Sequence, residues 1–200
     1  MFSAAFVAPE VDPDADATTV AAQVATRCGN PSTLVELSFV YVKEVDGVEV
    51  ERRHHQWRPR DGSVMVSWDD HVIELESLYP YVASTAPSDL AIAAYSSFIN
   101  DTYWLLAPCK VLDDSIVPSL TRDGQLALSF APDTLLSGGD RYWMTLDGGV
   151  VTHWDVLLKD GSHQAYTWDA PTRYGPLELS SRRVSADGRV VIRFEEIKVQ

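Results

Sequence analysis

The 200-residue sequence has few cysteines, few basic side chains and no long apolar run. Its two cysteines, Cys28 and Cys109, are too few for a disulfide scaffold, and the sequence leaves open whether they form one bridge or stay as buried thiols. The 16 basic residues against 29 acidic ones give a net charge of −13, which disfavours binding to nucleic acid and to anionic membranes. No stretch approaches the roughly 20 apolar residues of a transmembrane helix.

Motifs of catalysis are also missing. There is no Gly-x-Ser-x-Gly elbow, no Cys–His arrangement and no phosphate-binding glycine loop. His153, Asp155 and His163 are predicted on neighbouring strands, but a zinc site needs three or four well-spaced ligands, so we interpret them as solvent-facing. Acidic pairs such as Asp69-Asp70 flank strands, where exposed charge is ordinary. We therefore expect a protein that is not an enzyme, with no catalytic residue, metal or cofactor.

Antiparallel β-structure is the clearest prediction. Asp-Gly occurs six times between β-rich runs, and this dipeptide favours the type I′ turn of tight hairpins. Alternating apolar residues from Val35 to Tyr41 are typical of a half-buried strand. The predicted strands are 34–45, 48–58, 63–75, 125–131, 141–147, 150–159, 162–168, 177–185 and 189–199.

Two helices are expected. Val20, Val24 and Cys28 recur at every fourth position of a helix over 17–28, which Gly29-Asn30-Pro31 would end. Ser88 is a plausible N-cap for a second helix that runs to about Ile99. Residues 1–16 are expected to be a flexible lead-in to a single domain at 17–200, and residues 111–122 a long excursion that serves as a lid.

These elements predict a mainly β (α+β) fold. About nine antiparallel strands are expected to curl into a half-open β-barrel, and the second helix would fill the concave face. A curled sheet around a helix is also an arrangement that holds a hydrophobic ligand.

The stretch 97–108 is the densest apolar run, and Asn100 and Asp101 are embedded in it. Buried polar side chains need partners. We favour a structural role, in which Asn100 and Asp101 cap the helix end and bond backbone amides while Tyr103 and Trp104 fill the core. The alternative is a ligand-facing corner in which the polar pair meets a head group.

Aromatic side chains at hairpin spacing are the candidates for lining a cavity, although sheet-core packing would place the same residues inward. The candidate ligand-binding residues are Trp57, Trp68, Phe98, Tyr103, Trp104, Trp143, Trp154 and Trp168.

The segment Ser97 to Pro108, S-F-I-N-D-T-Y-W-L-L-A-P, resembles a motif of uncharacterised bacterial exported proteins that are similar to the LolA-like lipoprotein-carrier superfamily. The resemblance extends from about Leu37 to Val199. It implies a half-open β-barrel covered by helices, with a cavity for the acyl chains of lipids or lipoproteins, in a protein that works in the periplasm. No cargo-contacting residue of the carriers maps onto this sequence.

The sequence therefore predicts a monomeric extracytoplasmic protein that holds a lipid or a lipoprotein acyl chain by shape, without catalysis. Its opening segment lacks the basic region of a signal peptide, so export is expected from the resemblance alone. Two alternatives stay open: a structural or interaction domain with a filled core, and a hydrolase that uses one of the carboxylate or histidine groups.

Overall fold

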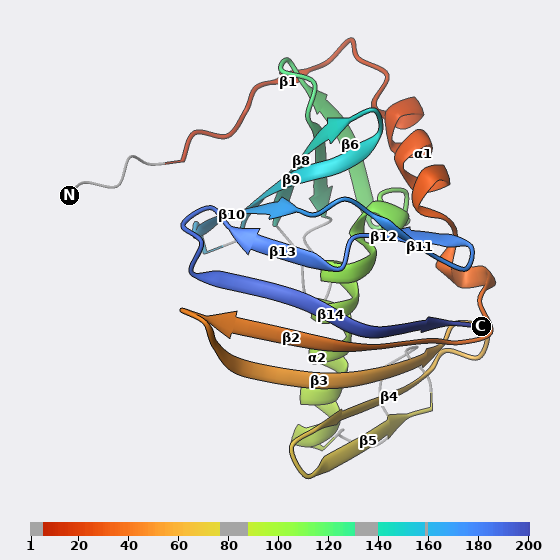
Figure 1. Ribbon diagram of the computed structural model, residues 1–200. Helices are drawn as coiled ribbons and strands as arrows, with labels where there is room; N and C mark the ends of the chain where they lie inside the picture. The colour runs from red at the N-terminus through yellow and green to blue at the C-terminus, as the bar shows by residue number, and fades with distance from the viewer. Residues whose placement is uncertain (1–5, 77–87, 131–139, 159) are drawn as a thin grey trace.

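The computed structural model describes residues 6–76, 88–130, 140–158 and 160–200, which form one strongly curved sheet with helices on its inner face (Figure 1). The sheet has 12 antiparallel strands in the order β1-β6-β7-β8-β9-β10-β13-β14-β2-β3-β4-β5. It is not closed, because β1 and β5 form its two edges. The fold is mainly β and half-open, as the sequence predicts.

The strands have the following bounds: β1 Val11–Asp12, β2 Leu37–Val45, β3 Val48–Arg58, β4 Ser63–Trp68, β5 His71–Leu75, β6 Ile116–Thr121, β7 Leu126–Phe130, β8 Arg141–Asp147, β9 Val150–Leu157, β10 His163–Trp168, β13 Arg182–Ser185 and β14 Val190–Val199. A separate hairpin consists of β11 Thr172–Tyr174 and β12 Leu177–Leu179.

All six Asp-Gly pairs lie between strands that are neighbours in the sheet. Only Asp46-Gly47 has positive φ at both residues, 51° and 80°, as the type I′ turn requires. In three of the other turns the aspartate side chain accepts a hydrogen bond from the backbone N–H two residues later, as Asp61 does from Ser63. The dipeptide therefore marks the hairpins correctly, but the type I′ prediction is wrong for most of them.

Three segments differ from the structure that the sequence predicts for them. The 63–75 run is a hairpin, because Asp69 adopts a positive φ of 46° and turns the chain between β4 and β5. The 111–122 segment is not a lid: half of it is β6, which pairs with β7 and β1. Val11 and Asp12, within the expected flexible lead-in, form β1.

Helix α1 (Ala17–Cys28) has the bounds that its sequence predicts. The Asp16 side chain caps its start by accepting from the Thr19 backbone N–H at 3.0 Å. Gly29 ends it with a φ of +96°, and a Cβ there would lie 2.4 Å from the Pro176 carbonyl oxygen. Glycine is thus required at this position for both its conformation and its lack of a side chain.

Helix α2 (Asp89–Leu106) is longer than predicted. Ser88 caps it as expected, accepting from the Ala91 backbone N–H at 3.2 Å. The helix continues past Ile99 through the whole apolar stretch and ends just before the 3₁₀ turn η2 (Ala107–Lys110), which contains Pro108. Asn100 and Asp101 therefore lie inside the helix, and the prediction that they cap its end is wrong.

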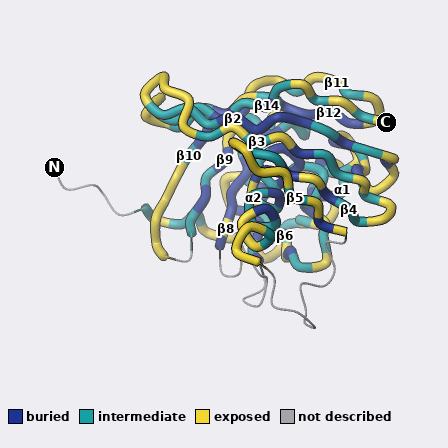
Figure 2. The backbone as a smooth tube through the Cα atoms, turned by 90° about the horizontal axis from the view of Figure 1, so that it is seen from below, coloured by how far each residue is buried: buried dark blue, intermediate teal, exposed yellow. Residues whose placement is uncertain are grey.

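The core lies between the helices and the inner face of the sheet (Figure 2). Helix α1 contributes Ala21 and Val24 to a cluster with β7, β8 and β9. The C-terminal half of α2 places Leu105 and Leu106 against β2 and β14, while Phe98 packs on β4.

A disulfide between Cys28 and Cys109 settles the question that the sequence leaves open. It joins the end of α1 to the turn that follows α2, across a sequence separation of 81 residues. The two helices are thus cross-linked at one end of the inner face.

Candidate functional site

A cleft of about 360 Å³ opens between α2 and the inner face of the sheet, and we call it the main cleft. Its aromatic walls are Tyr41, Tyr103, Trp104, Tyr142, Trp154 and Tyr166. Trp104 is central, because its ring centroid lies 4.9 Å from that of Trp154 and 4.7 Å from that of Tyr166. The volume falls within the range of small-molecule sites, about 300–1,000 Å³.

Aliphatic and polar side chains complete the main cleft. The aliphatic ones are Ile99, Val156, Leu158 and Ile192, and the polar ones are Lys43, Glu51, Asn100, Asp140 and Gln164. Glu51 is 2.8 Å from the Arg53 guanidinium and 3.5 Å from the Lys43 ammonium, so its charge is compensated. The walls of the cleft are therefore mixed: aromatic and aliphatic side chains lie beside five polar ones, and the charge of Glu51 is compensated.

Three tyrosines of the main cleft, Tyr41, Tyr103 and Tyr166, are held in the neutral form, and we call them the cleft tyrosines. Burial raises the pKa of each above its ordinary value, and a nearby carboxylate raises it further, Asp101 in the case of Tyr41. The cleft wall thus carries no tyrosinate charge at neutral pH.

Behind the main cleft, a buried polar cluster fastens α2 to β3. The Asp101 carboxylate is fully buried and accepts two hydrogen bonds from Arg53, at 2.7 and 2.9 Å. His55 Nε2 lies 2.8 Å from the same carboxylate, and Asn100 Nδ2 donates to it at 2.9 Å. Asp101 therefore has the partners that its burial demands, and they are side chains rather than backbone amides.

The cluster reaches the cleft wall through Arg53. Its guanidinium lies over the Tyr41 ring, 4.6 Å from the centroid. Burial by itself would lower the pKa of Arg53, but the hydrogen bonds and charge of Asp101 outweigh it and raise that pKa. Arg53 is thus a permanent cation that positions both Asp101 on the helix and Tyr41 on the sheet.

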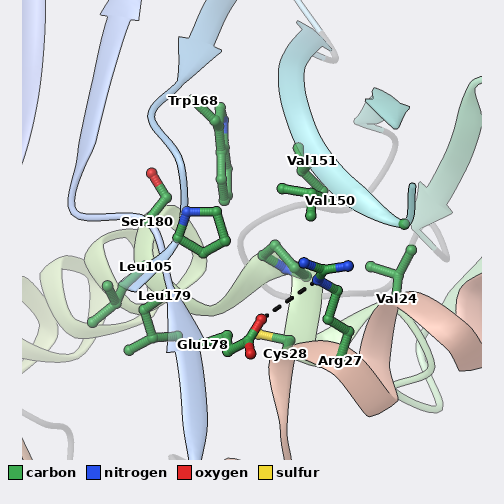
Figure 3. Close-up of a pocket in the computed structure, with 13 residues that line it drawn as sticks. Val24, Arg27, Cys28, Leu105, Val150, Val151, Trp168, Glu178, Leu179 and Ser180 are labelled. Atoms are coloured by element: carbon green, nitrogen blue, oxygen red, sulfur yellow. Dashed lines mark ion pairs between the residues drawn. The ribbon is translucent and has the colours of Figure 1, made fainter. Parts of the chain in front are cut away.

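The structure brings three of the eight candidate aromatic residues together in the main cleft: Tyr103, Trp104 and Trp154. Phe98 is packed in the core with Val64 and Val66, and Trp57 and Trp68 are partly buried against the same cluster. Trp168 belongs to the core beside Trp154 and lines a separate, smaller pocket (Figure 3).

Trp143 lies on the outer face of the sheet. Its neighbours Tyr142 and Met144 belong to the inner core, and alternation along β8 turns Trp143 the other way. It is nevertheless only 3% exposed and contacts Phe6, with ring centroids 5.3 Å apart. Trp143 therefore does not line the interior, contrary to the sequence-based candidate set.

The histidines and acidic residues do not assemble a metal site within the residues that the structure describes. His163 Nε2 lies 3.0 Å from the Asp155 carboxylate, whereas His153 Nδ1 lies 3.1 Å from the Thr152 hydroxyl oxygen. In the described part of the chain, neither helix is long and apolar enough to cross a membrane.

Sequence reasoning missed the cleft residues Tyr41 and Tyr142, and the Asp101 partners Arg53 and His55. The sequence contains patterns that could have indicated Arg53, His55 and Tyr142. Arg53 and His55 are two residues apart on a strand, so they share a face, and a buried aspartate in an apolar helix needs such partners. Tyr142 alternates with Trp143, so only one of the two can face the interior.

Comparison with known proteins places the fold. No family model and no curated protein matches the sequence. Among solved structures, a LolA superfamily protein from Nitrosomonas europaea is similar over 92% of this chain and 93% of that chain, with a TM-score of 0.54 and 10% sequence identity.

A domain from Vibrio parahaemolyticus named for outer membrane lipoprotein sorting is also similar, with a TM-score of 0.41 and 10% identity over 90% of this chain and 91% of that chain. This second similarity is too low to support an argument. The first one agrees with the open curved sheet and its two inner helices. The chain therefore has a LolA-like fold.

Proposed function

We propose that the protein binds a hydrophobic acyl chain, from a lipid or a lipoprotein, in the main cleft, and that it does so by burial rather than catalysis. The observation that carries the proposal is the cleft itself, which six aromatic rings line between α2 and the inner face of the sheet. The LolA-like fold supports it, since the sequence resemblance associates that fold with acyl-chain carriage.

The aromatic and aliphatic walls of the main cleft can hold an acyl chain by burial. Burying a methylene stabilises a complex by about 0.8 kcal/mol, so about eight methylenes contribute roughly 6 kcal/mol before the cost of association is subtracted. Five polar side chains also line the cleft, and among them Glu51 is already paired with Arg53 and Lys43. Affinity would thus come from the length of the chain buried, with the polar groups orienting its head group.

An extracytoplasmic location is part of the proposal. The Cys28–Cys109 disulfide supports it, because such bonds persist in oxidising compartments and are rare in the cytosol. We further propose that the working form is a monomer, with the hydrophobic ligand as its partner.

A structural domain without a ligand is the second candidate. Phe98 and Ala94 pack tightly in the core with β4, so half of α2 fills the interior instead of lining a space. The main cleft lies at the other half of α2. A ligand-binding protein should hold a ligand there, whereas a structural domain should not.

Native mass spectrometry of the purified protein, followed by solvent extraction and lipid analysis, tests the proposal. We expect a co-purifying acyl lipid that is lost in Trp104→Ala. Trp143→Ala is the matched control, because it removes an equally large buried ring from the outer face. A ligand-free mass, with no uptake of a fluorescent fatty acid, would contradict the proposal and favour the structural domain.

A further inference from the structure

Strand β5 forms one edge of the sheet, at the end of the molecule opposite β1 (Figure 1). It pairs with β4 without a register shift, and Trp68 faces His71 next to the turn. In an antiparallel pair, the backbone N–H and C=O groups of every second residue point away from the neighbouring strand. Because Trp68 and His71 flank a two-residue turn and form a bonded pair, these residues of β5 are Val72 and Glu74. Among the described residues, no strand pairs with them.

The β5 edge lacks the features that usually close a sheet edge. Proteins protect their edges with proline, lysine, bulges or very short strands. The opposite edge is protected in this way, because β1 has only two residues and lies between Pro9 and Pro13. β5 has five residues and contains no proline, lysine or bulge. Its outward backbone groups are therefore accessible to an added strand.

The β5 edge is also acidic. The chain has no lysine or arginine between Arg60 and Lys110, a span that includes β4, β5 and α2. The exposed acidic residues of this span are Asp61, Asp69, Asp70, Glu74, Glu76 and Asp89. None of these six carboxylates forms an ion pair within the part of the chain that the structure describes, and Arg52 of β3 is already paired with Glu49 and Glu195. Charge complementarity therefore favours a basic partner.

Apolar side chains lie on the inner side of the same edge. Ile73 and Leu75 pack in the cluster between the sheet and the first half of α2. At the start of α2, Leu90 and Ile92 are 40% and 46% exposed. Successive side chains of an added strand would point to opposite faces, inward beside Ile73 and outward beside Glu74. The edge therefore fits a strand in which apolar and basic residues alternate.

We propose that the β5 edge is a docking site for an extended segment of another protein, in which lysine or arginine alternates with apolar residues. Backbone hydrogen bonds to Val72 and Glu74 supply the affinity, and the alternating side chains supply the specificity. A second copy of this chain is disfavoured, because two β5 strands paired about Ile73 would place Asp70 opposite Glu76. The site goes beyond the proposed function, since none of these residues lines the main cleft.

The test is a titration of ¹⁵N-labelled protein with a seven-residue peptide of alternating lysine and valine. We expect the largest shifts at the backbone amides of β5 and at the Trp68 indole, with slower hydrogen exchange at Val72 and Glu74. One control peptide has glutamate in place of lysine. The other has its central amides N-methylated, so it keeps the charge but cannot pair as a strand. Both should bind at least about tenfold more weakly, as the loss of two or more hydrogen bonds implies for the second.

Two variants separate backbone pairing from charge. Val72→Pro removes an outward N–H and should weaken peptide binding at least about tenfold, whereas Val72→Ala keeps the N–H and is the matched control. Glu74→Lys should weaken binding about fivefold, because an opposite-charge pair across strands becomes a like-charge pair. Asp123→Lys makes the same change of net charge in the turn between β6 and β7, so it should have little effect.

Equal binding of the N-methylated peptide would mean association by charge alone and would overturn the proposal. Unchanged affinity in Val72→Pro or in Glu74→Lys would also overturn it, and the second variant keeps the test open if the first does not fold. Peptide shifts at Trp104 in place of β5 would have the same consequence. Fatty-acid uptake should be equal in Val72→Pro and the unmodified protein, so the failure of this site and the failure of the proposed function are distinguishable.

Discussion

Replacing Asp101 should destabilise the protein far more than replacing an aspartate on the surface would. The carboxylate is fully buried and holds Arg53 and His55 of β3 against α2. Asp101→Asn keeps the shape of the side chain but removes the charge and one acceptor oxygen. Arg53 would keep Glu51 as a partner, while the bond from His55 would lose its charged acceptor.

The size of the effect follows from the contacts. Arg53 and His55 make three close contacts with the carboxylate, at 2.7, 2.9 and 2.8 Å, and a hydrogen bond to a charged group contributes about 1.5–3 kcal/mol without strict additivity. Breaking a buried ion pair by removing one partner costs about 3–5 kcal/mol. Since Arg53 keeps one partner, we expect a loss of about 3 kcal/mol, a large part of the 5–15 kcal/mol that stabilises a typical domain.

Urea unfolding followed by tryptophan fluorescence and circular dichroism measures this loss. Asp46→Asn is the matched control, because Asp46 also accepts hydrogen bonds from two guanidinium nitrogens of an arginine, Arg189, but on the surface. It should leave the unfolding midpoint almost unchanged. If Asp101→Asn were no more destabilising than Asp46→Asn, the reasoning would be refuted.

Three further predictions concern stability. Replacing Cys28 and Cys109 by serine should lower the free energy of unfolding by about 4 kcal/mol, because the bridge closes a separation of 81 residues; equal urea midpoints for both forms would contradict this. Gly29→Ala should cost about 1–3 kcal/mol through its positive φ and the contact with the Pro176 carbonyl, and a neutral result by thermal melting would show that the α1 terminus can rearrange. The cleft tyrosines have raised pKa values when folded, so their contribution is complete below pH 10, the ordinary tyrosine value, and is lost as pH rises above it. Absorbance at the tyrosinate band should then show these groups ionising only with unfolding, whereas their ionisation near the ordinary pKa in the native state would contradict the burial argument.

The sheet could be predicted from sequence because its signals are local. Each Asp-Gly pair requires a turn, and residues such as Val40 to Val42 favour strands wherever they are placed. The extension of α2 past Ile99 could not be predicted, because Asn100, Asp101 and Thr102 are weak helix formers. They are helical because Arg53 and His55, about 46–48 residues earlier, bond Asp101. A long-range contact decided a local structure.

For the candidate site, the sequence predicts the types of residue that line it but not which of them do so. Aromatic residues on strands were correctly expected to face an interior in several cases, but the face that each one takes depends on the register of the strand. Trp143 faces outward because Tyr142 and Met144 face inward, and either choice fits the alternation. Whether an inward ring fills the core, as Phe98 does, or lines the main cleft, as Trp104 does, depends on how α2 lies across the sheet.

The most direct test of the proposed function is to locate a bound chain. Stearate that carries a spin label on its alkyl chain would be added to ¹⁵N-labelled protein, and the broadening of each tryptophan indole signal would be measured. Binding in the main cleft predicts the strongest broadening for Trp104 and Trp154, whose rings lie 4.9 Å apart, and weaker broadening for Trp143 on the outer face. Equal broadening of all signals, or none at saturating stearate, would contradict the account.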